Sequence, residues 1–280
     1  MTFDLIYTLA MISLVALIGV AYGVRVLLKG RAEHDRVNRQ GGSALLSKGV
    51  MEGAYWTLQP IGRLLVACRI TPNQISWTSF LFAILTAFCL AFGHFGFGAG
   101  FAAVSALLDA LDGMVARLTG SASDAGEVLD TTVDRYSEFL FLSGLVIYYR
   151  EIPVLMVLTL LALAGSFMVS YSTAKAEALH VDPPKGSMRR PERALYLTLG
   201  AALSPITISW FETPHEFPVP VGHPMVFALG LVAVLSNLSA IERLWAVSRA
   251  VRAREAERLA APAAAMDDEA EAHHEPVKLR

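Results

Sequence analysis

Long apolar runs alternate with short polar connections along most of the chain. Seven of these runs can be drawn as membrane-spanning helices: residues 3–28, 76–92, 97–118, 135–149, 153–178, 194–210 and 224–247. A helix needs about 20 predominantly apolar residues to cross the hydrocarbon core of a bilayer, and its backbone groups are satisfied within the segment. The runs lack the alternation, in segments of about ten residues, that is typical of a transmembrane barrel. The pattern therefore predicts an all-α integral membrane protein.

Composition supports this fold class. Of the 280 residues, 54% are hydrophobic and 17% are charged, which is too apolar for an ordinary soluble domain. The formal net charge of -2 gives no reason to expect a nucleic-acid partner. The first apolar run is longer than the core of a signal peptide, and its basic residues follow it, so we expect a retained first helix.

Lysine and arginine residues gather on one set of connections. They are frequent between the first and second runs, between the fifth and sixth, and after the seventh, whereas the opposite connections carry few of them. Cytoplasmic loops of membrane proteins carry such an excess of positive charge. We therefore expect a multi-pass protein of a bacterial inner membrane, with those three segments on the cytoplasmic side.

Two segments fall outside the apolar runs. Residues 54–69 mix aromatic and aliphatic residues with two arginines over a length too short to cross, which predicts an interfacial helix or, alternatively, a loop packed against the bundle. Residues 251–280 are small, polar and charged, which predicts a disordered cytoplasmic tail. The chain is thus divided into an extra N-terminal helix with a basic linker (1–53), a membrane domain (54–250) and the tail.

Four aspartates lie beside the third and fourth apolar runs. Asp109 and Asp112 are one helical turn apart, and Asp130 and Asp134 repeat this spacing on the next helix, which a short connection can turn toward the first. Ionised carboxylates are costly near lipid and normally mark a functional site. Arg117 alone cannot neutralise four of them, whereas Mg²⁺ and Mn²⁺ prefer oxygen ligands. The pattern predicts a metal site.

Small residues beside these aspartates favour phosphoryl chemistry. Two metal ions can clamp a pyrophosphate, glycine and alanine let a nucleotide approach the backbone, and an arginine can bind phosphate with two donors. A carboxylate that is free of metal could accept a proton from an incoming hydroxyl. The alternatives are a buried charge network without metal, an ion-coupled transporter and a catalytically silent scaffold.

The spacing of this segment resembles a known signature. Its fixed residues are Asp109, Asp112, Gly113, Ala116, Arg117, Gly126, Asp130 and Asp134. They are similar, at every position and spacing, to the signature of the CDP-alcohol phosphotransferases, also called CDP-alcohol phosphatidyltransferases. The likeness extends from about residue 61 to residue 248. It implies a six-helix core, here the second to seventh runs, with the first helix as an addition.

The resemblance also implies an activity. Members of the family are usually homodimers that transfer a substituted phosphate group from a CDP-linked lipid, such as CDP-diacylglycerol, to an alcohol and release CMP, in phospholipid biosynthesis. By the family pattern the main ligands of two Mg²⁺ or Mn²⁺ ions are Asp109, Asp112 and Asp130. Asp134 is then the general base and borders the second metal. The contacts to CDP are Asp112, Gly113, Ala116 and Arg117.

A basic segment between the fifth and sixth runs, at residues 170–194, is the candidate binding region for the acceptor. Its charge suits a phosphate-bearing acceptor or anionic headgroups, although the bias of cytoplasmic loops alone also predicts it. Within it Ser170-Tyr171, Ala174-Lys175-Ala176-Glu177 and Arg190-Pro191-Glu192-Arg193 resemble the bacterial phosphatidylinositol phosphate synthases. That likeness implies inositol phosphate as the acceptor.

Three residues of this segment are the expected acceptor contacts, namely Lys175, Arg190 and Arg193. Thr173 and Lys175 depart from the pattern of those synthases, which tend to have a lysine and an arginine there. An arginine binds phosphate with a planar pair of donors that lysine lacks. Glycerol 3-phosphate or another alcohol therefore stays open as the acceptor.

Overall fold

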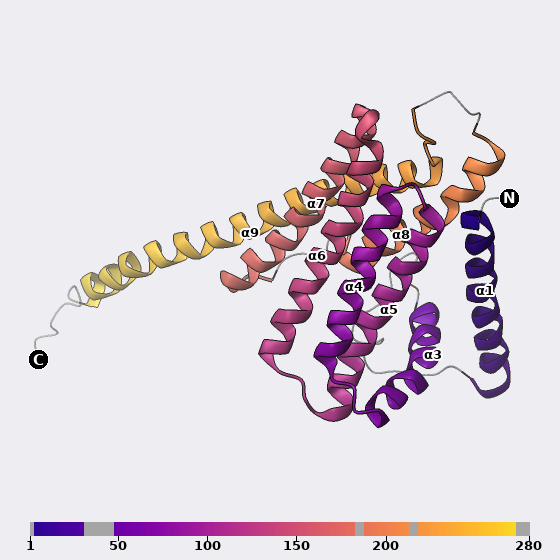
Figure 1. Ribbon diagram of the computed structural model, residues 1–280. Coiled ribbons are helices and arrows are strands. Elements are labelled where there is room, and N and C mark those ends of the chain that lie inside the picture. Colours follow the sequence, from indigo (N-terminus) through magenta and orange to yellow (C-terminus); the bar gives the residue numbers. More distant parts are fainter. Residues whose placement is uncertain (1–2, 31–47, 183–187, 213–217, 273–280) are drawn as a thin grey trace, which may run out of the picture.

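The computed structural model describes residues 3–30, 48–182, 188–212 and 218–272, and all their regular structure is helical (Figure 1). In chain order the elements are α1 (Phe3–Lys29), α3 (Lys48–Ala67), α4 (Pro72–Ala91), α5 (Phe95–Thr119), α6 (Asp124–Tyr148), the single 3₁₀ turn η1 (Tyr149–Glu151), α7 (Pro153–Ala178), α8 (Arg190–Trp210) and α9 (His223–Ala272). The predicted all-α class is confirmed.

Five of the described helices are long and apolar enough to cross a membrane: α1, α4, α5, α7 and the first part of α9. The protein is therefore a multi-pass membrane protein. The two remaining predicted runs, 135–149 and 194–210, lie in α6 and α8, which have 25 and 21 residues. These two helices do not belong to the apolar five, and both carry acidic or basic side chains in their first turns.

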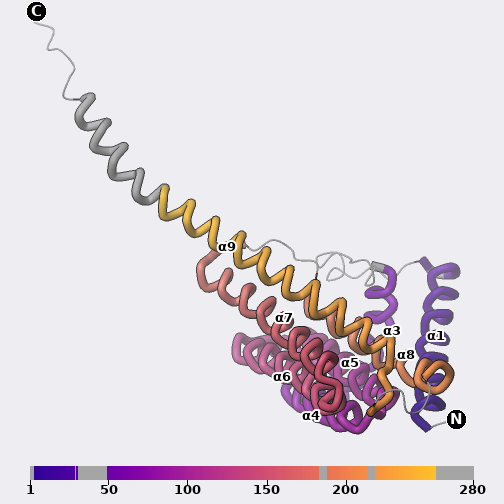
Figure 2. The backbone as a smooth tube through the Cα atoms, turned by 90° about the horizontal axis from the view of Figure 1, so that it is seen from above, coloured from indigo at the N-terminus to yellow at the C-terminus, as the bar shows by residue number. Residues whose placement is uncertain are grey.

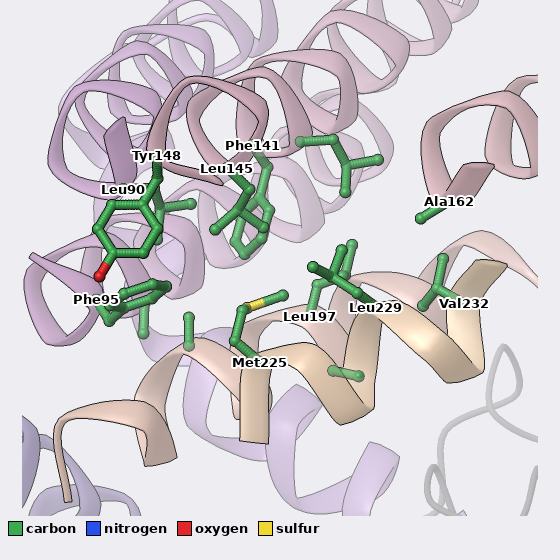
Figure 3. Packing of buried hydrophobic residues seen from close by; sticks show 14 of the residues in the cluster. Leu90, Phe95, Phe141, Leu145, Tyr148, Ala162, Leu197, Met225, Leu229 and Val232 are labelled. Atoms are coloured by element: carbon green, nitrogen blue, oxygen red, sulfur yellow. The ribbon is translucent and has the colours of Figure 1, made fainter. Parts of the chain in front are cut away.

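The helices form one bundle in which segments distant in sequence lie side by side (Figures 1 and 2). α4 packs on both α5 and α6, α7 packs on α9, and α8 joins α5 to α9. The main apolar core lies where these helices meet, and Figure 3 shows Leu90, Phe95, Leu145 and Met225 converging there from α4, α5, α6 and α9. Burial of such side chains holds α5 and α6, which carry the four aspartates, in fixed relative positions.

Close approach between α4 and α6 depends on a small residue. A Cβ atom added at Gly144 of α6 would lie 2.6 Å from the carbonyl oxygen of Ala87 in α4. Membrane helices commonly pack through such small residues, because van der Waals contact between backbones replaces the hydrophobic driving force that acts in water.

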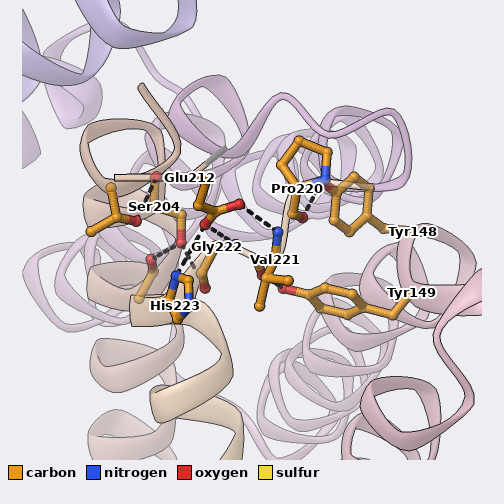
Figure 4. A network of polar contacts seen from close by, with 10 residues as sticks. Tyr148, Tyr149, Ser204, Glu212, Pro220, Val221, Gly222 and His223 are labelled. Atoms are coloured by element: carbon orange, nitrogen blue, oxygen red, sulfur yellow. Dashed lines mark hydrogen bonds and ion pairs between the residues drawn. The ribbon is translucent and has the colours of Figure 1, made fainter. Parts of the chain in front are cut away.

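The end of the bundle away from the aspartates is fixed by a polar network (Figure 4). Glu212, just after α8, accepts hydrogen bonds from the backbone nitrogens of Val221 at 2.7 Å and Gly222 at 2.8 Å. The hydroxyl of Tyr149, the first residue of η1 directly after α6, donates to the carbonyl oxygen of Val221 at 2.6 Å. This network joins α6 to the segment that leads into α9.

Two predicted boundaries differ from the structure. The boundary at 53/54 falls inside α3, which begins at Lys48 and so starts before the predicted helix at 54–69. α9 continues to Ala272, so residues 251–272 are helical and the disordered tail predicted for 251–280 is wrong over that part. The alanine, arginine and glutamate of this stretch are strong helix formers, so a small and charged composition is compatible with a continued helix. Residues 273–280 lie outside the described residues.

Candidate active site

A tight turn brings the two aspartate-bearing helices together. Gly120 ends α5 in the left-handed conformation, with φ of 65°, which a glycine adopts without strain. The backbone nitrogen of Ser121 donates to the carbonyl oxygen of Ala116 at 2.9 Å. Ser123 then caps α6, because its hydroxyl accepts a hydrogen bond from the backbone nitrogen of Gly126 at 3.2 Å. The chain reverses within four residues, and α6 starts beside the end of α5.

Three of the four aspartates converge. Asp109 and Asp112 of α5 and Asp130 of α6 each offer one carboxylate oxygen, and these atoms all lie within 4.8 Å of one another. Asp112 is buried, with 4% of its surface exposed, and the other two are partly buried. Below, these three residues are called the aspartate triad.

The donor set of the triad fits a hard divalent cation. It consists of oxygen atoms only, which Mg²⁺ and Mn²⁺ prefer over the nitrogen and sulfur ligands of softer metals. The hydroxyl of Ser76 in α4 donates a hydrogen bond of 2.6 Å to Oδ2 of Asp112. Such outer hydrogen bonds orient carboxylates that bind metal.

Asp134 lies one helical turn beyond Asp130 on α6, and its carboxyl group adjoins that of Asp109 in the triad. It is buried, with 8% of its surface exposed, and it forms an ion pair with Arg190 at the start of α8. Arg190 also contacts Asp109 at 3.3 Å, and so it connects Asp134 to the triad. The four carboxylates are therefore neighbours, as predicted: three form the cluster, and the fourth, Asp134, adjoins it at Asp109 and is also paired with an arginine.

Arg190 remains cationic in this setting. Burial acts against the charge of its guanidinium, but the neighbouring carboxylates of Asp109 and Asp134 outweigh burial and raise the pKa of Arg190 above its usual value. The three side chains also border a small cavity of about 80 Å³ between α4, α5, α6 and α8. The hydroxyl-bearing residues of its wall include Ser79, Ser105 and Ser137.

A much larger cavity of about 790 Å³ opens beside the triad. Its size lies within the range of about 300–1,000 Å³ that is typical of sites for small molecules. All four residues expected to contact CDP line it: Asp112, Gly113, Ala116 and Arg117. Asp130 borders it as well, so two members of the triad, Asp112 and Asp130, face the expected nucleotide site.

The start of α4 forms another wall of the large cavity. Thr71 caps the helix in a reciprocal arrangement, with Gln74 Oε1 accepting from the nitrogen of Thr71 at 2.9 Å and Thr71 Oγ1 accepting from the nitrogen of Gln74 at 3.4 Å. A serine one turn inside a helix carries no local signal that it faces an aspartate 36 residues away, so the contact of Ser76 with Asp112 is visible only in the structure.

The three expected acceptor residues are dispersed. Lys175 is exposed near the end of α7 and lines neither of the two cavities described above. Arg190 lies next to Asp134. Arg193 is almost fully buried, and its Nε and Nη2 atoms donate to the two carboxylate oxygens of Glu138 at 2.6 and 2.9 Å. Arg193 therefore forms an ion pair inside the bundle that joins α8 to α6.

Thr173, which departs from the synthase pattern, has a basic partner from another helix. Nη1 of Arg243 in α9 donates to the hydroxyl of Thr173 at 2.9 Å. Positive charge thus approaches this position from α9. Of the other basic residues in the segment, Lys185 lies outside the described residues.

Comparisons with known proteins show the family to which the chain belongs. The model of a family described as CDP-alcohol phosphatidyltransferase matches residues 69–236. The phosphatidylinositol phosphate synthase of Mycolicibacterium smegmatis is 30% identical over 68% of this chain and 82% of its own length. The archaetidylinositol phosphate synthase of Pyrococcus horikoshii is 32% identical over 67% of this chain and 89% of its own length.

Solved structures show the same relationship. The crystal structure of Mycobacterium tuberculosis phosphatidylinositol phosphate synthase with CDP-DAG bound matches with a TM-score of 0.57 and 30% identity, over 67% of this chain and 92% of that one. The structure of the same protein in complex with manganese and citrate matches with a TM-score of 0.58, over 67% of this chain and 87% of that one.

Proposed function

The chain belongs to the CDP-alcohol phosphatidyltransferase family, and from this membership and the geometry of the aspartate site we propose that it transfers the phosphatidyl group of CDP-diacylglycerol to inositol phosphate. The general reaction of the family is the metal-dependent transfer of a substituted phosphate group from a CDP-linked lipid to an alcohol, with release of CMP. The observation that supports a donor site here is that Asp112 and Asp130 of the aspartate triad line the 790 Å³ cavity. Membership in a family of enzymes leaves the transporter and the silent scaffold without support.

The triad has the role of a metal site in this proposal. Asp109, Asp112 and Asp130 would hold Mg²⁺ or Mn²⁺, which when bound neutralises charge on the pyrophosphate of the donor. Arg117 lines the same cavity, and a guanidinium can bind a phosphate oxygen pair. Gly113 and Ala116 leave space for the nucleotide to approach the backbone of α5.

Asp134 acts as the general base. It accepts the proton of the acceptor hydroxyl while the oxygen of that hydroxyl forms a bond to the phosphorus that carries diacylglycerol. The bond from this phosphorus to the bridging oxygen of CDP breaks, and CMP leaves with the electron pair. Arg190 orients the carboxylate through their ion pair, and the small cavity beside Asp134 keeps the base between helices rather than in open solvent.

Inositol phosphate is favoured as the acceptor by the names of the relatives. A phosphatidyl and an archaetidyl enzyme differ by name in their lipid, but both are named for an inositol phosphate product. Arg190 is the acceptor contact that we favour, because it lies beside Asp134. Lys175, exposed near the end of α7, is a second proposed contact. Arg193 acts through its pairing with Glu138 rather than by direct contact.

We further place the enzyme, as a homodimer, in a bacterial inner membrane with the aspartates on the cytoplasmic side. The distribution of lysine and arginine supports this orientation, since the connections between α1 and α4 and between α7 and α8 are richer in these residues than the connections at the opposite end of the bundle. Surface labelling of single introduced cysteines at the two ends of the bundle in intact cells would test it.

The decisive experiment measures CMP release by the purified full-length protein in nanodiscs that contain CDP-diacylglycerol and Mg²⁺ or Mn²⁺. Inositol phosphate, inositol, glycerol 3-phosphate and serine are supplied separately. We expect release with inositol phosphate only, no release by Asp134→Asn, and wild-type release by Asp182→Asn, an exposed aspartate outside the two cavities. Release with glycerol 3-phosphate instead would overturn the proposed acceptor, and turnover without divalent metal would refute the role of the triad.

A further inference from the structure

α1 lies outside the part of the chain that matches the family model, and it stands at the edge of the bundle in both views (Figures 1 and 2). Most of its surface is open, with only its first turns buried: Leu5 is 1% and Thr8 0% exposed, whereas Leu17 is 65% and Val20 64% exposed. An added membrane helix without a further role would need no specific polar contacts to the bundle. α1 makes such contacts near both of its ends.

The N-terminal end of α1 caps the helix that carries Asp109 and Asp112. The carboxylate of Asp4 accepts hydrogen bonds from the backbone nitrogens of Gly96 and Phe97, each at 3.0 Å. His94, the residue at the cap position of α5, makes no such side-chain bond. Tyr7 stacks on Phe97 with ring centroids 4.5 Å apart. α1 therefore supplies the free amide groups at the start of α5 with the acceptor that the local sequence lacks.

The other end of α1 holds α3. The ring of Tyr22 lies against Gly53, where an added Cβ would come 3.0 Å from Cδ1 of Tyr22, and its centroid is 5.7 Å from that of Trp56. The guanidinium carbon of Arg25 lies 5.7 Å from the centroid of the Trp56 ring, within the range of a cation–π contact. Two side chains of α1 thus contact one aromatic residue of α3.

α3 in turn packs on the catalytic part of α5. Leu58 of α3 forms a buried cluster with Leu111, Met114 and Val115 of α5, which flank Asp112 and Gly113. A Cβ added at Gly62 would come 2.7 Å from the sulfur of Met114, so the two helices are in close contact there. Near its end, α3 contributes Val66 to the wall of the 790 Å³ cavity.

We propose that α1 is a brace for the donor site: it fixes the start of α5 through Asp4 and holds α3, through Tyr22 and Arg25, against the turn of α5 that bears Asp112. Residues of α1 are then positioning residues for the CDP-linked lipid and touch no substrate. The proposal rests on the proposed function, since the cavity that α3 borders is taken to be the site of the donor.

The test uses the full-length protein in nanodiscs with Tyr22→Ala and Arg25→Ala combined, and Val20→Ala on the open face of α1 as the matched control. We expect the KM for CDP-diacylglycerol to rise about 5- to 10-fold, with kcat and the KM for the acceptor within about twofold of the wild type, because α3 borders the donor cavity and not the region of Asp134. Hydrogen exchange of residues 48–67 should become faster, while that of residues 72–91 stays as in the wild type.

The contact is also tested from its other side. Trp56→Ala should reproduce the rise in the donor KM. Trp56→Phe retains an aromatic face for Arg25, so its donor KM should stay close to that of the wild type. A fall in kcat at unchanged donor KM, or unchanged exchange of α3 in the double variant, would overturn the brace. Failure of the wild type to release CMP with any acceptor would instead reject the proposed function, while the exchange of α3 would still decide whether α1 holds it.

Discussion

The hydroxyl of Ser76 donates a hydrogen bond of 2.6 Å to the carboxylate of Asp112, and this bond joins the first turns of α4 to the aspartate triad on α5. Both residues are buried, with 4% of the surface of each exposed. The same hydroxyl lies 3.2 Å from the carbonyl oxygen of Pro72, so the serine is fixed by its own helix as well. The start of α4, with its proline and its capping residues, thereby orients an expected metal ligand.

Removal of this hydroxyl should weaken metal binding. Ser76→Ala leaves one oxygen of Asp112 without its donor, and the loss of such an outer contact typically costs about 10- to 100-fold in metal affinity. The Mg²⁺ or Mn²⁺ concentration for half-maximal CMP release should rise accordingly, with most of kcat recovered at saturating metal. Thr78→Ala, which removes a hydroxyl bonded only to Gln74 of the same helix, is the control. An unchanged metal requirement would show that Ser76 does not orient Asp112.

Loss of the base should separate turnover from donor binding. Asp134→Asn keeps the size of the side chain but cannot accept a proton at neutral pH, so turnover should fall at least about 100-fold. Binding of the CDP donor should change little, because Asp134 lies outside the large cavity. Equilibrium binding of a CDP-lipid and CMP release, measured on the same preparation, give the two quantities. An equal loss of both would show that Asp134 supports the donor site instead.

The pair formed by Arg193 and Glu138 should contribute to stability. The two side chains are 1% and 9% exposed, and removing one partner of a buried ion pair costs about 3–5 kcal/mol because the other charge is left uncompensated. Arg193→Met should therefore lower the midpoint of thermal unfolding in detergent clearly. The double variant Arg193→Met with Glu138→Gln should recover part of the loss. If the single variant unfolds like the wild type but the acceptor KM rises, Arg193 is a direct acceptor contact after all.

The contact between α4 and α6 should not tolerate a methyl group. Gly144→Ala places a Cβ against the backbone of Ala87, and since two packed helices must shift to accept it, the expected cost is about 1–3 kcal/mol. Gly230→Ala in α9 is the matched control, because nothing lies within 4 Å of a Cβ added there. That change should be neutral or stabilising, as alanine is the better helix former by about 0.5–1 kcal/mol. Equal unfolding temperatures for the two variants would contradict the close packing of α4 and α6.

Much of the site was predictable because its determinants are local. The spacing of Asp109, Asp112 and Asp130 indicated that their side chains converge, since a helix places residues three or four apart on one face. The short connection at Gly120 also makes α6 run back beside the end of α5. The same holds for the four expected contacts to CDP, which all line the large cavity. The helices themselves followed from apolar length, which a bilayer makes a strong constraint.

Only the tertiary structure decided which polar groups became partners. Asp134 continues the aspartate stripe of α6 in sequence, but its partner is Arg190, 56 residues later, which also contacts Asp109 of the triad. Arg193 looked like Arg190 in sequence, yet Glu138 of α6 engages it within the bundle. The partners of Ser76 and Asp4 had no signal in the sequence, because they are 36 and more than 90 residues away. The sequence by itself determined the helices and the identity of the reactive groups, since these depend on residues that are neighbours along the chain. The pairing of charges and hydroxyls depends on which helix faces come together, and the packing of the whole bundle decides that.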